Sequence, residues 1–148
     1  MKIIFVCTGN TCRSPMAEYL LQDLLAQEEI DIEVESAGIM ASPGSPPTPE
    51  TEQVLRENGY ESISSHQAQH VSELSLSPGD LLLGMTAKHR AFLADKVPEQ
   101  IEVSTLNEYL DTEVDLSDPF GSDIDTYRRL YQQLKPALEE LKKLLREQ

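Results

Sequence analysis

Apolar residues follow two patterns along the chain. Short apolar runs indicate buried strands, and longer segments with an apolar residue at every third or fourth position indicate amphipathic helices. The runs predict strands at Lys2–Val6, Ile32–Ser36, Asp80–Met85 and Ile101–Leu106. The periodic segments predict one helix that starts at Ser14, and others at Glu50–Asn58, near Val71–Leu74, at Thr86–Lys96 and at Ile124–Glu147.

Residues at the edges of these segments support the assignment. Ser14 suits the N-cap of the first helix and Pro15 its first helical position, while Gly59 suits the end of the second helix. The Pro- and Ser-rich stretch Ser42–Pro49 is expected to be a surface loop. Asp111–Asp123 is expected to be a second loop, and its final residue suits the N-cap of the last helix.

Strands that alternate with helices indicate βαβ units and therefore a parallel sheet. We expect one α/β domain over residues 1–148, in which a four-stranded parallel sheet forms the middle of three layers and helices cover both faces. A chain of 148 residues is long enough to bury a core without disulfides or metal ions. No internal repeat or change of composition marks a second domain.

Composition and charge narrow the class of protein. The chain is 39% hydrophobic and 26% charged, as in ordinary globular proteins, and its formal net charge is -14. This charge argues against nucleic acid and anionic membrane surfaces as partners, because both are bound through Lys and Arg. No apolar run approaches the roughly 20 residues that span a bilayer, and IIFVC near the start is too short for a signal peptide. Two closely spaced cysteines do not make a secreted disulfide framework, so a cytoplasmic protein with reduced thiols is expected.

The stretch CTGNTCRSP, from Cys7 to Pro15, carries the candidate chemistry. It follows the first predicted strand, and ligands of parallel sheets bind at this carboxyl edge. Gly9 permits a positive φ and Asn10 tolerates one, so successive backbone amides can turn inward around an anion. The helix dipole points at the same place, and Arg13 adds a planar fork for two phosphate oxygens. The loop therefore predicts a site for a tetrahedral oxyanion.

A cysteine at the base of this loop predicts covalent catalysis. Inward amides, the helix N-terminus, Arg13 and the Ser14 hydroxyl all favour the thiolate of Cys7, which would attack phosphorus in line. The loop lacks Walker spacing, and its single glycine is not a dinucleotide fingerprint. No metal or other cofactor is needed, because the loop supplies the positive field. The three histidines show no ligand spacing and are expected on the surface: His66, His70 and His89.

Phosphoryl transfer also needs an acid. The leaving atom must gain a proton, and a water must later lose one, so one carboxyl near the phosphate can serve both steps. The loop before the last helix offers five carboxyls, among which the residues alone do not choose: Asp111, Asp115, Asp118, Asp123 and Asp125.

The sequence resembles the low-molecular-weight protein tyrosine phosphatases. Their Cys-X5-Arg-Ser signature at the end of the first strand matches Cys7 to Ser14, and their Asp-Pro signature before the last helix matches Asp118-Pro119. The resemblance implies that Cys7 is the nucleophile, Arg13 the phosphate clamp and Asp118 the general acid. It also implies a phosphate-binding loop made of Thr8, Gly9, Asn10, Thr11, Cys12, Arg13 and Ser14.

Two residues bear on the substrate. Many tyrosine-specific members carry a bulky aliphatic residue where this chain has Thr11, and Asp-Pro-Tyr where it has Asp-Pro-Phe. The bacterial protein-arginine phosphatases resemble the chain more closely at both places. Thr11 would leave polar room beside a guanidinium, and Phe120 would offer it a π-face. We therefore expect phosphoarginine in proteins as the substrate, with phosphotyrosine as the alternative.

Two other functions share this architecture. Arsenate reductases of similar fold relay oxidation through further cysteines, and this chain has none after Cys12. A phosphate-binding module without catalysis would lack the nucleophile, the arginine or the acid, and all three are present. Cys12 raises a further hypothesis, because a thiolate at Cys7 is open to oxidation and a neighbouring thiol could trap it as a reversible disulfide.

Overall fold

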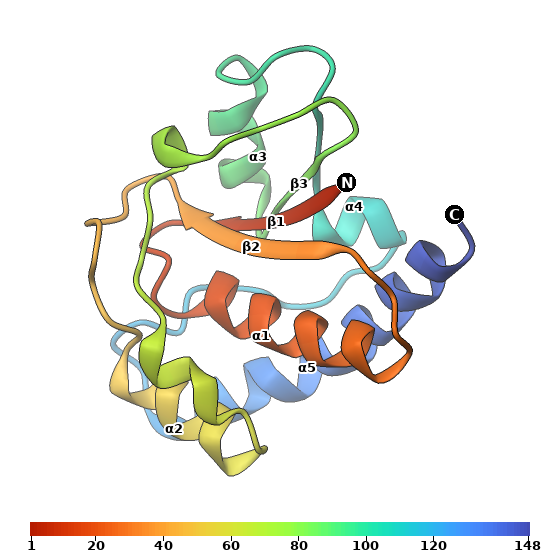
Figure 1. Cartoon of the computed structure of the whole chain (residues 1–148). Helices are drawn as coiled ribbons and strands as arrows, with labels where there is room; N and C mark the ends of the chain where they lie inside the picture. The colour runs from red at the N-terminus through yellow and green to blue at the C-terminus, as the bar shows by residue number, and fades with distance from the viewer.

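A computed structural model describes residues 1–148 and contains one four-stranded parallel sheet. Its order is β2-β1-β3-β4, and all three neighbouring pairs are parallel (Figure 1). The strands are β1 (Lys2–Cys7), β2 (Glu33–Gly38), β3 (Leu81–Gly84) and β4 (Glu102–Thr105). The predicted fold class is confirmed, and the predicted strands agree with these to within two residues at each end.

Helices cover both faces of the sheet. Figure 1 shows α1, α2 and α5 on one side of the sheet and α3 on the other. The α-helices are α1 (Arg13–Gln27), α2 (Pro49–Glu57), α3 (Ala87–Ala94), α4 (Leu106–Leu110) and α5 (Ile124–Arg146). Two 3-10 turns follow α2, namely η1 (Glu61–Ser65) and η2 (Val71–Glu73), the second where a short helix is predicted. No helix combines the length and the apolar character needed to cross a membrane.

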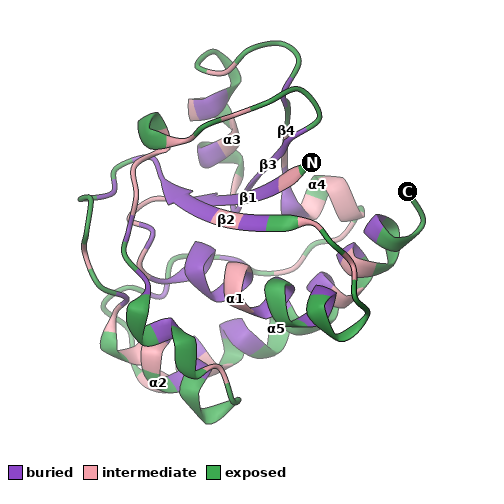
Figure 2. Ribbon diagram, in the orientation of Figure 1, coloured by how far each residue is buried: buried purple, intermediate pink, exposed green.

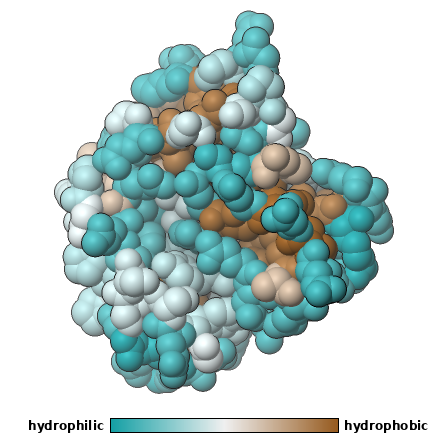
Figure 3. Space-filling model, viewed as in Figure 1, coloured by the Kyte–Doolittle hydropathy of each residue, from teal (hydrophilic) through white to brown (hydrophobic).

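The alternation of side chains along β1 explains its uninterrupted apolar run. Ile3, Phe5 and Cys7 belong to the larger core cluster, between the sheet and α1 and α5. Ile4 and Val6 belong to the smaller cluster on the opposite face. A strand that is buried on both faces has no polar side to show. Figure 2 shows most of β1 and β2 buried and the outer sides of the helices exposed. Hydrophilic residues cover most of the face in Figure 3.

The N-cap and the first helical position predicted for α1 are wrong. Cys12, not Ser14, is the N-cap, and Pro15 is the third helical residue rather than the first. Proline is tolerated there because the first-turn amides have no partner within the helix. The Ser14 hydroxyl lies 2.9 Å from Cys7 Sγ and therefore serves the loop instead of capping the helix. The other cap signals are confirmed: Gly59 follows α2 with φ 93, and the Asp123 side chain accepts from the Thr126 amide.

One helix is absent from the sequence prediction. Leu106, expected to end the last strand, begins α4 instead. The Thr105 hydroxyl accepts from the Glu108 amide at 3.0 Å and caps this helix. A helix of five residues is too short to show a period in the sequence.

The strand order determines where a ligand can bind. β1 lies between β2 and β3, so the connections that leave β1 and β3 diverge to opposite sides. In open parallel sheets, the point where neighbouring connections diverge is called the topological switch point. A crevice forms there at the carboxyl ends of the strands. The loop between β1 and α1 occupies that position.

Candidate active site

A cavity of about 210 Å³ lies over the loop that follows β1. It brings together the nucleophile, arginine and acid proposed from the sequence, together with most of the loop. Its lining consists of Cys7, Thr8, Gly9, Thr11, Cys12, Arg13, Asp118 and Phe120. Residues more than 100 positions apart in the chain thus meet at one site.

Cys7 lies at the base of this cavity and is 2% exposed. Its Sγ is 2.9 Å from Ser14 Oγ, and the Asn10 amide donates to it at 3.3 Å. Hydrogen bonds to sulfur stabilise a negative charge there, and the N-terminus of α1 adds its dipole. The surroundings of Cys7 are therefore suited to a thiolate.

Asn10, rather than Gly9, carries the left-handed backbone of the loop. Its φ is 58°, whereas Gly9 has no positive φ. The Asn10 side chain holds this conformation, because Oδ1 accepts from the Gln69 amide at 2.9 Å and Nδ2 donates to Ser14 and Ser36 at 2.9 and 2.8 Å. Asn tolerates this region because its short polar side chain bonds locally. Of the two residues expected to allow a positive φ, only Asn10 adopts one, and its side chain holds the loop in this conformation.

Gly38 allows the end of a neighbouring strand to approach the loop. It ends β2 beside the loop, and a Cβ there would lie 2.5 Å from Thr8 O and 3.0 Å from Asn10 N. Only glycine lets the two backbones approach this closely. The Met40 amide donates to the same Thr8 carbonyl, at 2.9 Å, so the end of β2 supports the loop from outside.

Arg13 is buried and has one nitrogen without a partner. Its Nη1 donates to Leu116 O at 3.1 Å, and its Nη2 lies 3.7 Å from Asp118 Oδ2. Its Nε is buried and unpaired. A buried guanidinium nitrogen that lacks an acceptor is costly, and an oxyanion in the cavity would satisfy it.

Asp118 is the one carboxylate of the preceding loop that lines the cavity. Leu116 and Pro119 are buried on either side of it, so packing holds the loop while Asp118 itself is exposed. Its Oδ1 accepts from the Phe120 amide at 3.0 Å, which orients the carboxylate. Of the five candidate carboxyls, Asp118 alone lines this cavity. Asp123 caps α5, and Asp125 pairs with Arg128 at 2.9 Å.

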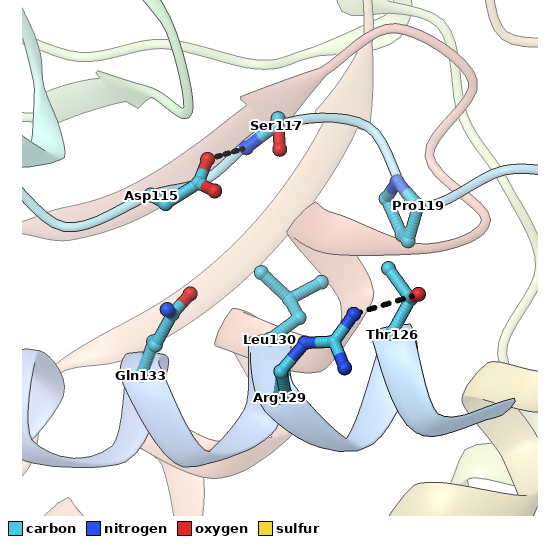
Figure 4. Close-up of a pocket in the computed structure, with 7 residues that line it drawn as sticks. All are labelled: Asp115, Ser117, Pro119, Thr126, Arg129, Leu130 and Gln133. Carbon is cyan, nitrogen blue, oxygen red and sulfur yellow. Dashed lines mark hydrogen bonds between the residues drawn. The ribbon is translucent and has the colours of Figure 1, made fainter. Parts of the chain in front are cut away.

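A second hollow, of about 190 Å³, lies on the other side of this loop, against α5. Figure 4 shows Asp115 and Ser117 bonded to each other above the helix, and Arg129 bonded to Thr126 on it. No hydrogen bond in this view joins the loop to α5. Asp115 therefore lies away from the first cavity, in the same loop as Asp118.

The expectation that the histidines lie on the surface is wrong. His66 and His89 are 7% and 1% exposed, and His70 is half-buried. His66 Nε2 donates to Asn10 O at 2.9 Å, and His89 Nε2 lies 3.0 Å from Thr8 Oγ1. Both therefore contact the loop from segments distant in sequence. The spacing of the histidines in the sequence does not indicate this role, because each ring forms its own hydrogen bond to the loop.

Glu18 extends the hydrogen-bonded network behind the loop. Ser36, which accepts from Asn10, donates to Glu18 Oε1. Burial raises the pKa of Glu18 to about 7, and the hydrogen bond from Ser36 offsets part of this effect. The sequence does not indicate this role, because Glu18 lies within α1 and most helical glutamates are on the surface.

The raised pKa of Glu18 predicts a pH-dependent stability. Between its ordinary value of 4.5 and about 7, the folded protein keeps a proton that the unfolded chain has released. The free energy of unfolding should therefore fall as pH rises through this window, by about 3 kcal/mol from this group. Urea unfolding of Glu18→Gln, which cannot ionise, should lack this component. The exposed Glu33→Gln serves as control, and an equal pH slope in Glu18→Gln and wild type would contradict the assignment.

Comparison with known proteins identifies the family. The family model described as low molecular weight phosphotyrosine protein phosphatase matches residues 2–148. A Bacillus subtilis protein named protein-arginine-phosphatase is 38% identical over 148 residues, covering 99% of this chain and 97% of its own. A Staphylococcus epidermidis protein named low molecular weight protein-tyrosine-phosphatase PtpB is 34% identical over 142 residues, covering 96% and 97%.

Solved structures agree with this match. A YwlE mutant from Bacillus subtilis superposes with a TM-score of 0.89 at 38% identity, covering 99% of both chains. A C7S mutant of YwlE arginine phosphatase with a phosphorylated active-site serine gives 0.88 at 36%, covering 99% of this chain and 97% of that one. The resemblance predicted from the sequence is confirmed: the chain belongs to the low molecular weight phosphotyrosine protein phosphatase family.

Proposed function

We propose that this protein phosphatase removes phosphate from phosphoarginine side chains of proteins through a phosphocysteine intermediate. The observation that carries the proposal is the cavity in which Cys7, Arg13 and Asp118 meet beside the short polar side chain of Thr11. Its substrates are phosphorylated proteins, and it would act in the cytoplasm, where its thiols stay reduced.

The proposed first step is transfer of the phosphoryl group to sulfur. The Cys7 thiolate attacks phosphorus, the P–S bond forms and the P–N bond to the guanidinium breaks. The Asp118 carboxyl donates a proton to the leaving nitrogen. The electron pair of the broken P–N bond therefore ends in a new N–H bond of the departing arginine. Arg13 holds the transferring oxygens, for which its unpaired Nε is suited. The Cys7-to-Ser variant of a related arginine phosphatase, with its phosphorylated serine, supports this covalent route.

The second step releases phosphate. Asp118, now a carboxylate, accepts a proton from a water that attacks the phosphocysteine, and the P–S bond breaks. Sulfur leaves as a thiolate, stabilised by the Ser14 hydroxyl and the Asn10 amide. The protonated Asp118 and the thiolate of Cys7 are then ready for another substrate, so the cycle balances without a metal or cofactor.

Thr11 and Phe120 support arginine as the substrate. Thr11 is half-buried in the cavity wall, and Phe120 is 70% exposed at its mouth, where its ring is open to a guanidinium. Stacking a cation on such a ring contributes on the order of 0.5–2 kcal/mol. Relatives of similar identity are named for arginine and for tyrosine, so phosphotyrosine is the second candidate.

Thr11→Ile should separate the two substrates. The change adds apolar bulk and removes the hydroxyl beside the scissile bond, so phosphoarginine should clash and lose a polar neighbour. Overpacking and the lost contact together cost about 2–4 kcal/mol, or roughly 30- to 1,000-fold in kcat/KM. Phosphotyrosine, whose ring tolerates an apolar wall, should lose little. The measurement is kcat/KM on phosphoarginine and phosphotyrosine peptides of one sequence, before and after the change.

Thr11→Val is the matched control, because it removes the hydroxyl with little change in volume. It should show only the smaller, polar part of the loss. A wild type that prefers phosphotyrosine, or a ratio that stays within about threefold in Thr11→Ile, would replace the arginine assignment with the tyrosine one.

Cys12 is proposed to protect Cys7 from irreversible oxidation. It is 5% exposed, it lies in the same loop, and its Sγ is 3.6 Å from both Thr48 Oγ1 and Tyr127 Oη. Oxidation of Cys7 to a sulfenic acid would be followed by attack of the Cys12 thiol, with water leaving and a disulfide forming. Mild peroxide followed by a thiol reductant should restore wild-type activity and restore Cys12→Ser much less. Equal recovery in the two proteins would leave Cys12 with a packing role alone.

A further inference from the structure

His89 is a buried histidine that contacts the phosphate loop and has no part in the mechanism above. It lies in the first turn of α3, which follows β3 at the carboxyl edge of the sheet. Gly84 allows this close approach, because a Cβ there would lie 3.1 Å from His89 Cβ and 3.0 Å from Arg90 N. The ring thereby reaches Thr8, 81 positions away in the chain.

The hydrogen bonds of His89 determine which ring nitrogen carries the proton. Nδ1 accepts from the Thr86 backbone amide at 3.2 Å, and an amide can only donate. The Thr86 hydroxyl also lies 3.0 Å from this nitrogen. A neutral ring with an unprotonated Nδ1 carries its proton on Nε2. Burial, and next the charge of Arg13, lower the pKa of His89 to about 4, so the ring is neutral near pH 7.

The tautomer in turn directs the Thr8 hydroxyl. Nε2–H donates to Thr8 Oγ1 at 3.0 Å, which occupies one lone pair of that oxygen. Thr8 Oγ1 makes no other hydrogen bond with the protein, and Thr8 lines the cavity. Its proton is therefore available to an acceptor in the cavity. The guanidinium nitrogens of the leaving arginine bear donors, whereas the phosphoryl oxygens accept, so the phosphate is the partner that fits.

We propose that His89 is a positioning residue for the substrate phosphate: it donates to Thr8 and so turns the Thr8 hydroxyl toward a phosphoryl oxygen. The inference rests on the proposed phosphatase function, and it applies to phosphoarginine and to phosphate esters alike, because the contact is to the phosphoryl oxygens. The relay runs from the Thr86 amide through the imidazole to Thr8. Protonation of Nδ1 would break it, because two donors would then face each other.

The first test needs no variant. A long-range ¹H–¹⁵N spectrum of the full-length protein near pH 7 should show His89 protonated at Nε2 and not at Nδ1. A ring protonated at Nδ1, or at both nitrogens, would overturn the proposal. This measurement is independent of catalysis, so it remains decisive if the arginine assignment fails.

The second test is a double-mutant cycle with p-nitrophenyl phosphate as substrate and inorganic phosphate as inhibitor. His89→Leu and Thr8→Val should each lower kcat/KM and weaken phosphate inhibition by about 10-fold. If His89 acts through the Thr8 hydroxyl, the double variant should lose little more than either single one. His89→Gln, whose amide retains a donor, should recover part of the loss.

His70→Leu is the matched control. His70 has the same bonding pattern, since Nδ1 accepts from the Ser72 amide and Nε2 lies 3.0 Å from a carbonyl, but that carbonyl belongs to Ile39. Its kinetics should stay within about twofold of wild type. If the losses in kcat/KM multiplied in the His89→Leu, Thr8→Val double variant, His89 would not act through Thr8. Its role would then be only to cap α3. A wild type without activity on p-nitrophenyl phosphate would instead refute the proposed function.

Discussion

Cys7→Ser is expected to lower turnover by about 10⁴-fold or more, the largest effect of any single change in this protein. A serine hydroxyl is not ionised near pH 7, so the attack on phosphorus loses its nucleophile. Any serine that is phosphorylated should stay so, because an alkoxide is a poorer leaving group than a thiolate. The measurements are steady-state turnover of p-nitrophenyl phosphate and mass spectrometry of the intact chain, which should gain at most one phosphoryl group.

Binding of inorganic phosphate should survive this change. The groups proposed to hold the oxyanion are the loop amides and Arg13, and the change leaves both in the protein. Cys12→Ser is the matched control, since it removes the other thiol of the same loop and leaves the backbone amide of this position in place. It should keep activity on p-nitrophenyl phosphate under reducing conditions. More than about 5% residual activity in Cys7→Ser would exclude the covalent route.

Asp118→Asn should have the second largest effect, and its size should depend on the leaving group. An amide neither gives a proton to the departing atom nor takes one from water, and such catalysis contributes about 10²- to 10⁴-fold. Substrates with poor leaving groups should suffer the full loss. For p-nitrophenyl phosphate, whose leaving group needs little protonation, formation of the phosphocysteine should slow least. Burst kinetics of this substrate therefore separate the two steps.

Asp115→Asn is the control for this change. Asp115 lies in the same loop but lines the hollow against α5 instead of the first cavity (Figure 4). It should keep turnover within about threefold of wild type on every substrate. If Asp118→Asn slowed good and poor leaving groups equally, Asp118 would be holding Arg13 rather than moving protons, since the two groups lie 3.7 Å apart.

The fold was accessible from the sequence because its signals are local. A strand buried on both faces, such as β1, has an uninterrupted run of apolar residues. A long surface helix such as α5 has apolar residues at every third or fourth position. The chemistry of the loop was accessible for the same reason. Cys7 and Arg13 lie six positions apart, where a strand passes into a helix, so their spacing alone brings both to one cavity. Where the pattern is short, as in α4, sequence periodicity carries no information.

The sequence by itself thus determined the parallel sheet, the phosphate loop and the family, and through the family it singled out Asp118. Only the tertiary structure decided what supports the loop. Gly38 and His89 are distant from the loop in sequence, and they meet it because parallel strands bring their carboxyl ends to one edge of the sheet. His66 reaches the loop from the end of η1. Likewise, the sequence around Ser14 is typical of a helix N-cap, but in the structure its hydroxyl lies 2.9 Å from Cys7 Sγ. Hydrogen bonds between remote segments leave no period or spacing in a single sequence, because each depends on where the whole chain has placed its partner.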